Sequence, residues 1–183
     1  MSTMSAPSAR MLTREDLDRM PDDGNRYELI DGEIVVSAAP VPPHQIAATR
    51  LLVTLAAACP AHLEVSHAPF DVVLGEHTVV QPDVLVLDPA DLDSRGLTGP
   101  PLLAVEVLSP STRRRDLGIK KRAYEQAGVA AYWVVDPEAD EVTLTAWELR
   151  DGSYVAAGAV AGDEVWAAST PFSVTIAPSR LRR

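Results

Sequence analysis

The sequence predicts a mixed α/β (α+β) domain, in which helices flank a central mixed β-sheet, with an N-terminal β-hairpin and a C-terminal β-meander. Three observations lead to this fold class. Residues 102–135 are typical of a strand, a helix and a second strand, and such a crossover produces a parallel strand pair. Asp31-Gly32 separates two β-prone runs, which is a strong hairpin signal. Residues 141–150 alternate apolar and polar side chains, and short β-prone pieces continue to residue 176.

Length and composition predict one domain with a sizeable core, because the chain has 183 residues, of which 46% are hydrophobic. We expect residues 1–11 to be a disordered N-terminal tail, residues 12–178 a single domain and residues 179–183 a basic C-terminal tail. The single cysteine, Cys59, excludes an intramolecular disulfide and a Cys-rich zinc site, and fits a reducing compartment.

The N-terminal residues show no apolar h-region of a signal peptide, and no apolar run is long enough to span a bilayer. These features predict a cytoplasmic protein without a membrane partner.

The first half of the chain is expected to hold a short helix, the hairpin and a core helix. Residues 13–16 resemble a capping box, so a short helix should follow and end before Pro21. The hairpin strands are predicted over residues 26–30 and 33–36. A helix over residues 44–59 has apolar residues on several sides, which indicates that it is largely covered.

Two predicted core strands each carry a carboxylate. The apolar run 78–87 is interrupted by Asp83 just after Pro82, and the apolar run 102–108 contains Glu106. A carboxylate in a buried strand is costly unless it is paired, protonated or bound to a metal. Two of them on neighbouring strands predict a cation site. Pro82 cannot donate to the ladder, so it indicates a bulge or an edge position, and bulges often re-aim a side chain at an active site.

The crossover helix is predicted over residues 113–126. Asp116, Lys120 and Tyr124 are spaced four residues apart, so they should share one face of this helix. The spacing of Asp116 and Lys120 is also typical of an ordinary ion pair on the helix surface, which would need no functional role.

The charge distribution gives opposing indications. The formal net charge of −10 argues against a nucleic-acid binder, because phosphate contacts are built from Lys and Arg. However, positive residues gather near the start of the crossover helix, at Arg113, Arg114, Arg115, Lys120, Lys121 and Arg122. This cluster is either a solvated helix face or a contact surface for phosphates.

Several short motifs follow one another in a specific order: residues 26–33, Pro43-His44, Pro82-Asp83-Val84, residues 105–112, Asp116 with Lys120 and Tyr124, Gly128-Val129 and residues 132–136. This ordered set, within residues 12–176, resembles the Uma2 family of restriction-endonuclease-like proteins, which is widespread in bacteria. The family is assigned to the PD-(D/E)XK nuclease superfamily. The resemblance implies a restriction-endonuclease-like mixed sheet flanked by helices and hydrolysis of phosphodiester bonds with a divalent metal ion.

The resemblance implies catalytic roles for Asp83 and Glu106. Both would hold Mg²⁺ or Mn²⁺, with the Val107 carbonyl as a further oxygen ligand. The superfamily's lysine is expected two residues after the second acid, where this chain has Leu108. In Uma2-like chains the lysine has moved to the following helix, which implies Lys120.

Four further residues are expected to support the site. Glu28 matches the acid that the superfamily often adds from an early element, and His44 begins a helix in a matching segment. Tyr124 could pack beneath Lys120 and hold it in place, and Asp116 lies on the same helix face.

The positive cluster would lie at the mouth of the site. There, Arg113, Arg114, Arg115 and Lys121 would hold phosphates as backbone contacts. Lys121 is a poorer candidate than Lys120 for catalysis, because it points about 100° away around the helix.

The sequence therefore favours a metal-dependent endonuclease that acts on DNA. One alternative is a non-catalytic module of the same fold that binds nucleic acid or protein, which Leu108 and the acidic charge favour. Another is a hydrolase of a different phosphate ester. A homodimer formed through exposed sheet edges is a further expectation.

Overall fold

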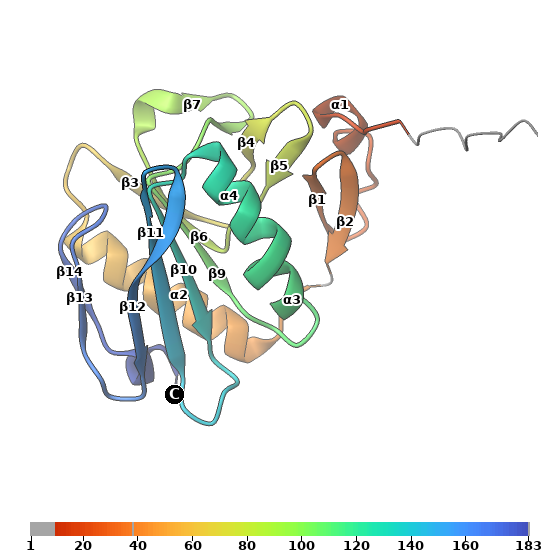
Figure 1. Cartoon of the computed structure of the whole chain (residues 1–183). Coiled ribbons are helices and arrows are strands. Elements are labelled where there is room, and N and C mark those ends of the chain that lie inside the picture. The colour runs from red at the N-terminus through yellow and green to blue at the C-terminus, as the bar shows by residue number, and fades with distance from the viewer. Residues whose placement is uncertain (1–9, 38, 183) are drawn as a thin grey trace, which may run out of the picture.

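The computed structural model describes residues 10–37 and 39–182 (Figure 1). Its central sheet contains six strands in the order β12-β11-β10-β9-β6-β3. These strands are β3 (Glu64–His67), β6 (Val84–Leu87), β9 (Leu103–Val107), β10 (Ala131–Asp136), β11 (Thr143–Arg150) and β12 (Ser153–Ala161). Only β9 and β10 run parallel, and every other neighbouring pair in this sheet is antiparallel. The predicted mixed sheet is therefore confirmed.

A second sheet, here called the outer sheet, has the order β2-β1-β5-β4-β8-β7. Its strands are β1 (Arg26–Ile30), β2 (Glu33–Ser37), β4 (Val72–Gly75), β5 (Thr78–Val80), β7 (Leu92–Asp93) and β8 (Gly96–Thr98). The predicted hairpin joins β1 to β2, and both Asp31 and Gly32 have positive φ angles, as an Asp-Gly hairpin turn requires. A separate pair, β13 (Trp166–Ala168) and β14 (Val174–Ile176), ends the β-rich C-terminal region.

Two proline-containing segments pass from one sheet to the other. Residues 63–74 form β3 of the central sheet and β4 of the outer sheet, with Pro69 between them. The predicted strand 78–87 is likewise divided into β5 and β6, with Pro82 between them. Because proline has no N–H for the ladder, each strand ends there and its continuation pairs with different neighbours. This break places Asp83 at the junction of the two sheets.

Helices lie on both faces of the central sheet (Figure 1). Helix α2 (Pro42–Ala58) covers one face, where its Leu51 and Leu55 join a cluster with Val105 and Val107 of β9. The crossover helix covers the opposite face. It consists of α3 (Arg113–Arg115), a π-helical turn (Asp116–Lys120) and α4 (Lys121–Ala127).

The outer sheet packs on the same face of the central sheet as the crossover helix. Ile30 and Val80 of the outer sheet share a buried cluster with Leu85 of β6, Ala104 of β9 and Tyr124 of α4. Since side chains alternate along a strand, Glu106 points to this face together with Ala104, while Val105 and Val107 point to α2. Glu106 is thus enclosed between the central sheet, the crossover helix and β1.

Two short helical elements complete the fold. Helix α1 (Arg14–Leu17) precedes the hairpin, with the expected capping box at Thr13. Near the C-terminus, a 3₁₀ turn over Pro178–Leu181 buries Leu181 in the core, and Arg50 donates hydrogen bonds to the Arg180 and Arg182 carbonyls. Residues 179–182 of the segment expected to be a tail therefore lie against the domain. Residues 1–9 of the expected N-terminal tail lie outside the described residues.

Within the part of the chain that the structure describes, no helix combines the length and the apolar character needed to cross a membrane.

Gly96 allows β8 to approach the loop that carries Asp71, and its φ is +138°. A Cβ there would overlap the Asp71 carbonyl oxygen, which accepts a hydrogen bond from the Leu97 N–H. We predict that Gly96→Ala lowers the free energy of unfolding by more than roughly 3 kcal/mol, because backbone strain and steric overlap add.

Gly128→Ala is the matched control. Gly128 also has a positive φ, +85°, but a Cβ there would meet no atom within 4 Å. Backbone strain alone should cost it roughly 1–2 kcal/mol. Chemical denaturation of both variants measures the difference, and equal losses would contradict the steric explanation.

Candidate active site

Asp83 and Glu106 meet where the pairing between β6 and β9 ends. Val84 lies opposite Val105 in this antiparallel pair, so continuing the register by one residue places Asp83 opposite Glu106. Two like charges in directly opposite positions destabilise a sheet unless other groups neutralise them. The surroundings of each carboxylate show how this is achieved.

Asp83 is 4% exposed and has a partner on each carboxylate oxygen. Arg26 Nη1 donates to Oδ1 at 2.9 Å, while Oδ2 lies 3.0 Å from His44 Nε2 and accepts the Val107 N–H at 2.8 Å. Burial by itself would raise the pKa of Asp83. The hydrogen bond and electrostatic interaction with His44, together with the charge of Arg26, outweigh burial and hold this pKa below its ordinary value. Asp83 is therefore ionised.

Glu106 and Glu28 share one buried ammonium group. Lys120 Nζ lies 2.5 Å from Glu106 Oε1 and 2.9 Å from Glu28 Oε1, and none of these three side chains is more than 1% exposed. The Tyr124 hydroxyl donates to Glu106 Oε1 at 2.7 Å, and the Gln81 main-chain N–H donates to Glu28 Oε1 at 2.8 Å. The three charged side chains come from β1, β9 and the crossover helix.

The crossover helix presents Lys120 through its π-helical turn. Asp116, Lys120 and Tyr124 are all buried, as expected for residues on one helix face. Such wider turns occur often at functional sites. Lys121 points elsewhere, with Nζ 4.0 Å from the centre of the Trp147 ring. Leu108, which stands where the superfamily's lysine is expected, is packed in the apolar cluster beside Tyr124.

Two of the buried carboxyls in the site have raised pKa values. Burial, together with the charges of Asp83, Asp116 and Glu28, raises the pKa of Glu106 to about 8 despite the opposing effect of Lys120. Burial also raises the pKa of Asp116, whose main-chain carbonyl accepts a hydrogen bond from the Tyr132 hydroxyl at 2.8 Å. Without a ligand, the site is therefore expected to keep a proton on Glu106 near neutral pH.

The donor atoms fit a hard divalent cation. The described residues contain no group of three or more His, Cys, Asp or Glu side chains arranged to hold a metal. However, Mg²⁺ commonly takes only one or two protein carboxylates and completes its coordination with water and phosphate oxygens. Glu28 Oε2 is buried without a hydrogen-bond partner, and both contacts of Glu106 fall on Oε1. One carboxylate oxygen of Glu28 is thus available as a ligand, and the contacts given for Glu106 use only one of its two oxygens.

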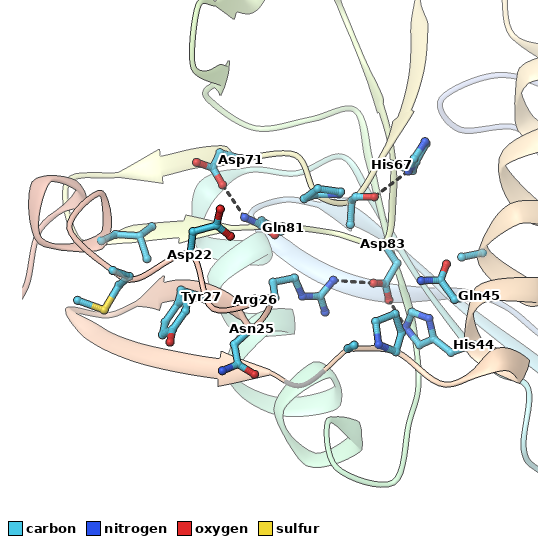
Figure 2. A pocket seen from close by; sticks show the side chains of 18 of the residues that line it. Asp22, Asn25, Arg26, Tyr27, His44, Gln45, His67, Asp71, Gln81 and Asp83 are labelled. Atoms are coloured by element: carbon cyan, nitrogen blue, oxygen red, sulfur yellow. Dashed lines mark hydrogen bonds and ion pairs between the residues drawn. The ribbon is translucent and has the colours of Figure 1, made fainter.

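The site opens into a pocket with a volume of about 930 Å³. Arg26, His44 and Asp83 lie along it, and Figure 2 shows the Arg26–Asp83 ion pair in the middle of the view with His44 beside it. Glu28, Glu106 and Lys120 are not among the lining residues. Asp83 therefore separates the pocket from the buried Glu28–Lys120–Glu106 group.

The residues predicted to bind nucleic acid do not line this pocket. Arg113 is paired with Asp136, and Arg115 Nη2 donates to Ser37 Oγ at 2.7 Å. Arg114 is exposed, and Lys121 stacks on Trp147. Their role in binding phosphates stays a prediction.

No role in the site was predicted from the sequence for Arg26 or for the side chain of Gln81. Arg26 could have been found, because it stands two residues before Glu28 on a strand and therefore on the same face. Nothing in the sequence around Gln81 indicates that its side-chain amide donates to Asp71 Oδ1 at 2.8 Å.

Comparisons with known proteins agree with this architecture. The model of the Uma2 family, described as "Putative restriction endonuclease", matches residues 14–179. The structure is similar to the crystal structure of a "putative nuclease belonging to DUF820" from Anabaena variabilis, with a TM-score of 0.72 over 93% of this chain and 97% of that chain. The two chains are 15% identical, so this likeness shows a shared fold. A search of curated proteins found no match.

We predict that Lys120→Met lowers the free energy of unfolding by about 3–5 kcal/mol, because it leaves the ionised Glu28 buried without its nearest cation. Lys121→Met makes the same chemical change one residue away and should cost less than about 1 kcal/mol, since it removes a half-exposed cation–π contact. Chemical denaturation compares the two. Equal losses would mean that Lys120 does not compensate the buried carboxylates.

The raised pKa of Glu106 also predicts how stability depends on pH. The folded protein keeps the proton up to about pH 8, whereas the unfolded chain releases it near 4.5. The folded state binds one more proton between these values, so this residue makes the free energy of unfolding fall as pH rises through the window. The slope is at most about 1.4 kcal/mol per pH unit. Glu106→Gln should flatten the profile, and unchanged pH profiles would contradict the assignment.

Proposed function

Because the chain belongs to the Uma2 family, we propose that it is a metal-dependent endonuclease that hydrolyses phosphodiester bonds in DNA. The observation that carries this proposal is the position of Lys120. Its ammonium group lies 2.5 Å from Glu106, which is itself opposite Asp83, so two acids and a lysine from separate elements converge at one point. The nuclease description of the structural neighbour supports the same reaction class.

Asp83 and Glu106, with the main-chain carbonyl of Val107, are the residues that would hold Mg²⁺ or Mn²⁺. The bound ion would supply Lewis acidity toward the phosphate and neutralise charge on it. The raised pKa of Glu106 supports this assignment. Burial and the charges of Asp83, Asp116 and Glu28 favour its protonated form, and a divalent cation bound beside it would stabilise the ionised carboxylate.

Lys120 would stabilise negative charge that develops on the phosphate, or would orient the attacking water. Both roles need an ammonium group whose position is fixed. Glu28 holds Lys120 from the side of β1, while Tyr124 orients the shared oxygen of Glu106. These contacts fix the lysine before a substrate binds, which is the kind of preorganisation that lowers a reaction barrier.

Arg26 and His44 would keep Asp83 ionised and in one orientation. Since an ionised carboxylate only accepts hydrogen bonds, His44 Nε2 must be the donor in its contact with Asp83. The Val107 N–H fixes the same oxygen from the side of β9. We assign Arg26 and His44 as positioning residues for Asp83.

Cleavage of DNA by the purified protein tests the proposal. Supercoiled, linear and single-stranded DNA would be incubated with Mg²⁺ or Mn²⁺, and we predict that Glu106→Gln lowers the cleavage rate at least about 100-fold. Removal of divalent ions with a chelator should abolish cleavage, and their return should restore it. Glu33→Gln is the matched control, because Glu33 is an exposed glutamate of the same hairpin as Glu28. A Glu106→Gln variant as active as the wild type would refute the assignment.

A non-catalytic binding module is the second candidate. The buried Leu108 at the usual lysine position favours it, because Lys120 then need only stabilise the fold. DNA binding without cleavage under any metal condition would support this candidate. Metal binding without cleavage of DNA or RNA would instead indicate another phosphate ester as substrate.

A further inference from the structure

The pocket in front of Asp83 is rich in hydrogen-bond acceptors and poor in available cations. Asp18, Asp22, Asp71 and Asp83 all line it. Among the described residues that line it, Arg26 is the one Arg or Lys, and Asp83 already pairs with it at 2.9 Å. Such a lining repels the phosphates of a nucleic-acid backbone, so a strand cannot be held here mainly through phosphate contacts.

Gln81 adds an acceptor whose orientation is fixed. Its Nε2 donates to Asp71 Oδ1 at 2.8 Å, and this contact determines the amide orientation because an ionised carboxylate cannot donate. Gln81 Oε1 is consequently left buried without a partner. A buried acceptor without a hydrogen bond is unfavourable, and a donor on a bound ligand would relieve that cost.

His44 gives a second, independent indication of a ligand. The His44 side chain is 9% exposed and lines the pocket, and its Nδ1 has no hydrogen-bond partner while Nε2 is engaged by Asp83. Figure 2 shows Asp71 and Gln81 toward one side of the pocket and His44 toward the other. Unused polar groups therefore lie on either side of the Arg26–Asp83 pair.

The remaining lining suits a flat, partly apolar ligand. Tyr27 contributes an aromatic ring, and Met20, Pro40, Leu52 and Pro69 contribute apolar surface. The volume of about 930 Å³ falls within the range of small-molecule sites. Nucleobases combine flat π-faces with polar edges, and proteins bind unpaired bases by stacking and by hydrogen bonds to those edges.

We propose that this pocket binds an unpaired nucleobase that carries an exocyclic amino group, as adenine, cytosine and guanine do. The inference rests on the proposed function and names its substrate class as single-stranded nucleic acid, or a base turned out of a duplex. The N–H groups of such an amino group would donate hydrogen bonds to Gln81 Oε1 and to the aspartate carboxylates. In a duplex the base stays in the stack, so it must be unpaired to enter a recess.

Binding of homopolymers tests the proposal. The full-length Glu106→Gln variant, which is used to prevent cleavage, would be titrated with fluorescent oligodeoxycytidine, oligodeoxythymidine and a mixed-sequence duplex. Cytosine and thymine are both pyrimidines, but only cytosine carries an amino group. We expect oligodeoxycytidine to bind roughly tenfold more tightly than oligodeoxythymidine and the duplex. Equal binding of both homopolymers, or tightest binding of the duplex, would overturn the inference.

Gln81→Met in the same background removes the acceptor and keeps an unbranched side chain. We expect the preference for oligodeoxycytidine to fall to about twofold or less, while Gln126→Met, a change at an exposed glutamine of α4, leaves it intact. An unchanged preference in Gln81→Met would reject the role of Gln81. Equal homopolymer binding with cleavage by the wild type would overturn this inference alone, whereas no binding to any probe and no cleavage would overturn the proposed function as well.

Discussion

The ammonium group of Lys120 between Glu28 and Glu106 is the interaction on which the site depends. It joins the outer sheet, the central sheet and the crossover helix at a point where none of the three side chains is more than 1% exposed. Buried ions are tolerated only when a partner compensates them, so these elements cannot separate without leaving a charge unpaired. The apolar cluster around Tyr124 holds the same elements together, and Tyr124 also donates a hydrogen bond to Glu106. Packing and electrostatics therefore specify the same arrangement.

The two acids opposite each other on β6 and β9 are placed in different environments. Arg26, His44 and the Val107 N–H keep Asp83 ionised, whereas burial and neighbouring carboxylates favour the proton on Glu106. Environments that push the pKa values of paired carboxylates apart are a recurrent feature of catalytic sites. In the proposed enzyme, a divalent cation would add to the charge of Lys120 and stabilise the ionised form of Glu106. The acceptor-rich pocket beyond Asp83 would then bind a base, while the buried acids would hold the cation that acts on the phosphate.

Much of this arrangement could be predicted from local sequence signals. Asp83 and Glu106 are visible as carboxylates in apolar runs, the hairpin as Asp-Gly, and the shared burial of Lys120 and Tyr124 as a four-residue spacing. What could not be predicted depends on partners distant in the chain. At Pro69 and Pro82 the chain passes from one sheet to the other, and this depends on which strands pair with each segment. Likewise, a run of arginines does not reveal that Arg113 pairs with Asp136 or that Arg115 contacts Ser37.

The most direct test of a cation site formed by Asp83 and Glu106 is a crystal structure of the protein with Mn²⁺, using anomalous scattering to locate the ion. We expect one anomalous peak within coordination distance of carboxylate oxygens of both residues, with Lys120 still paired to Glu28. A structure grown at saturating Mn²⁺ with no peak at this position would contradict the central claim. Asp83 would then be a buried acid stabilised by Arg26 and His44, and Glu106 one stabilised by Lys120.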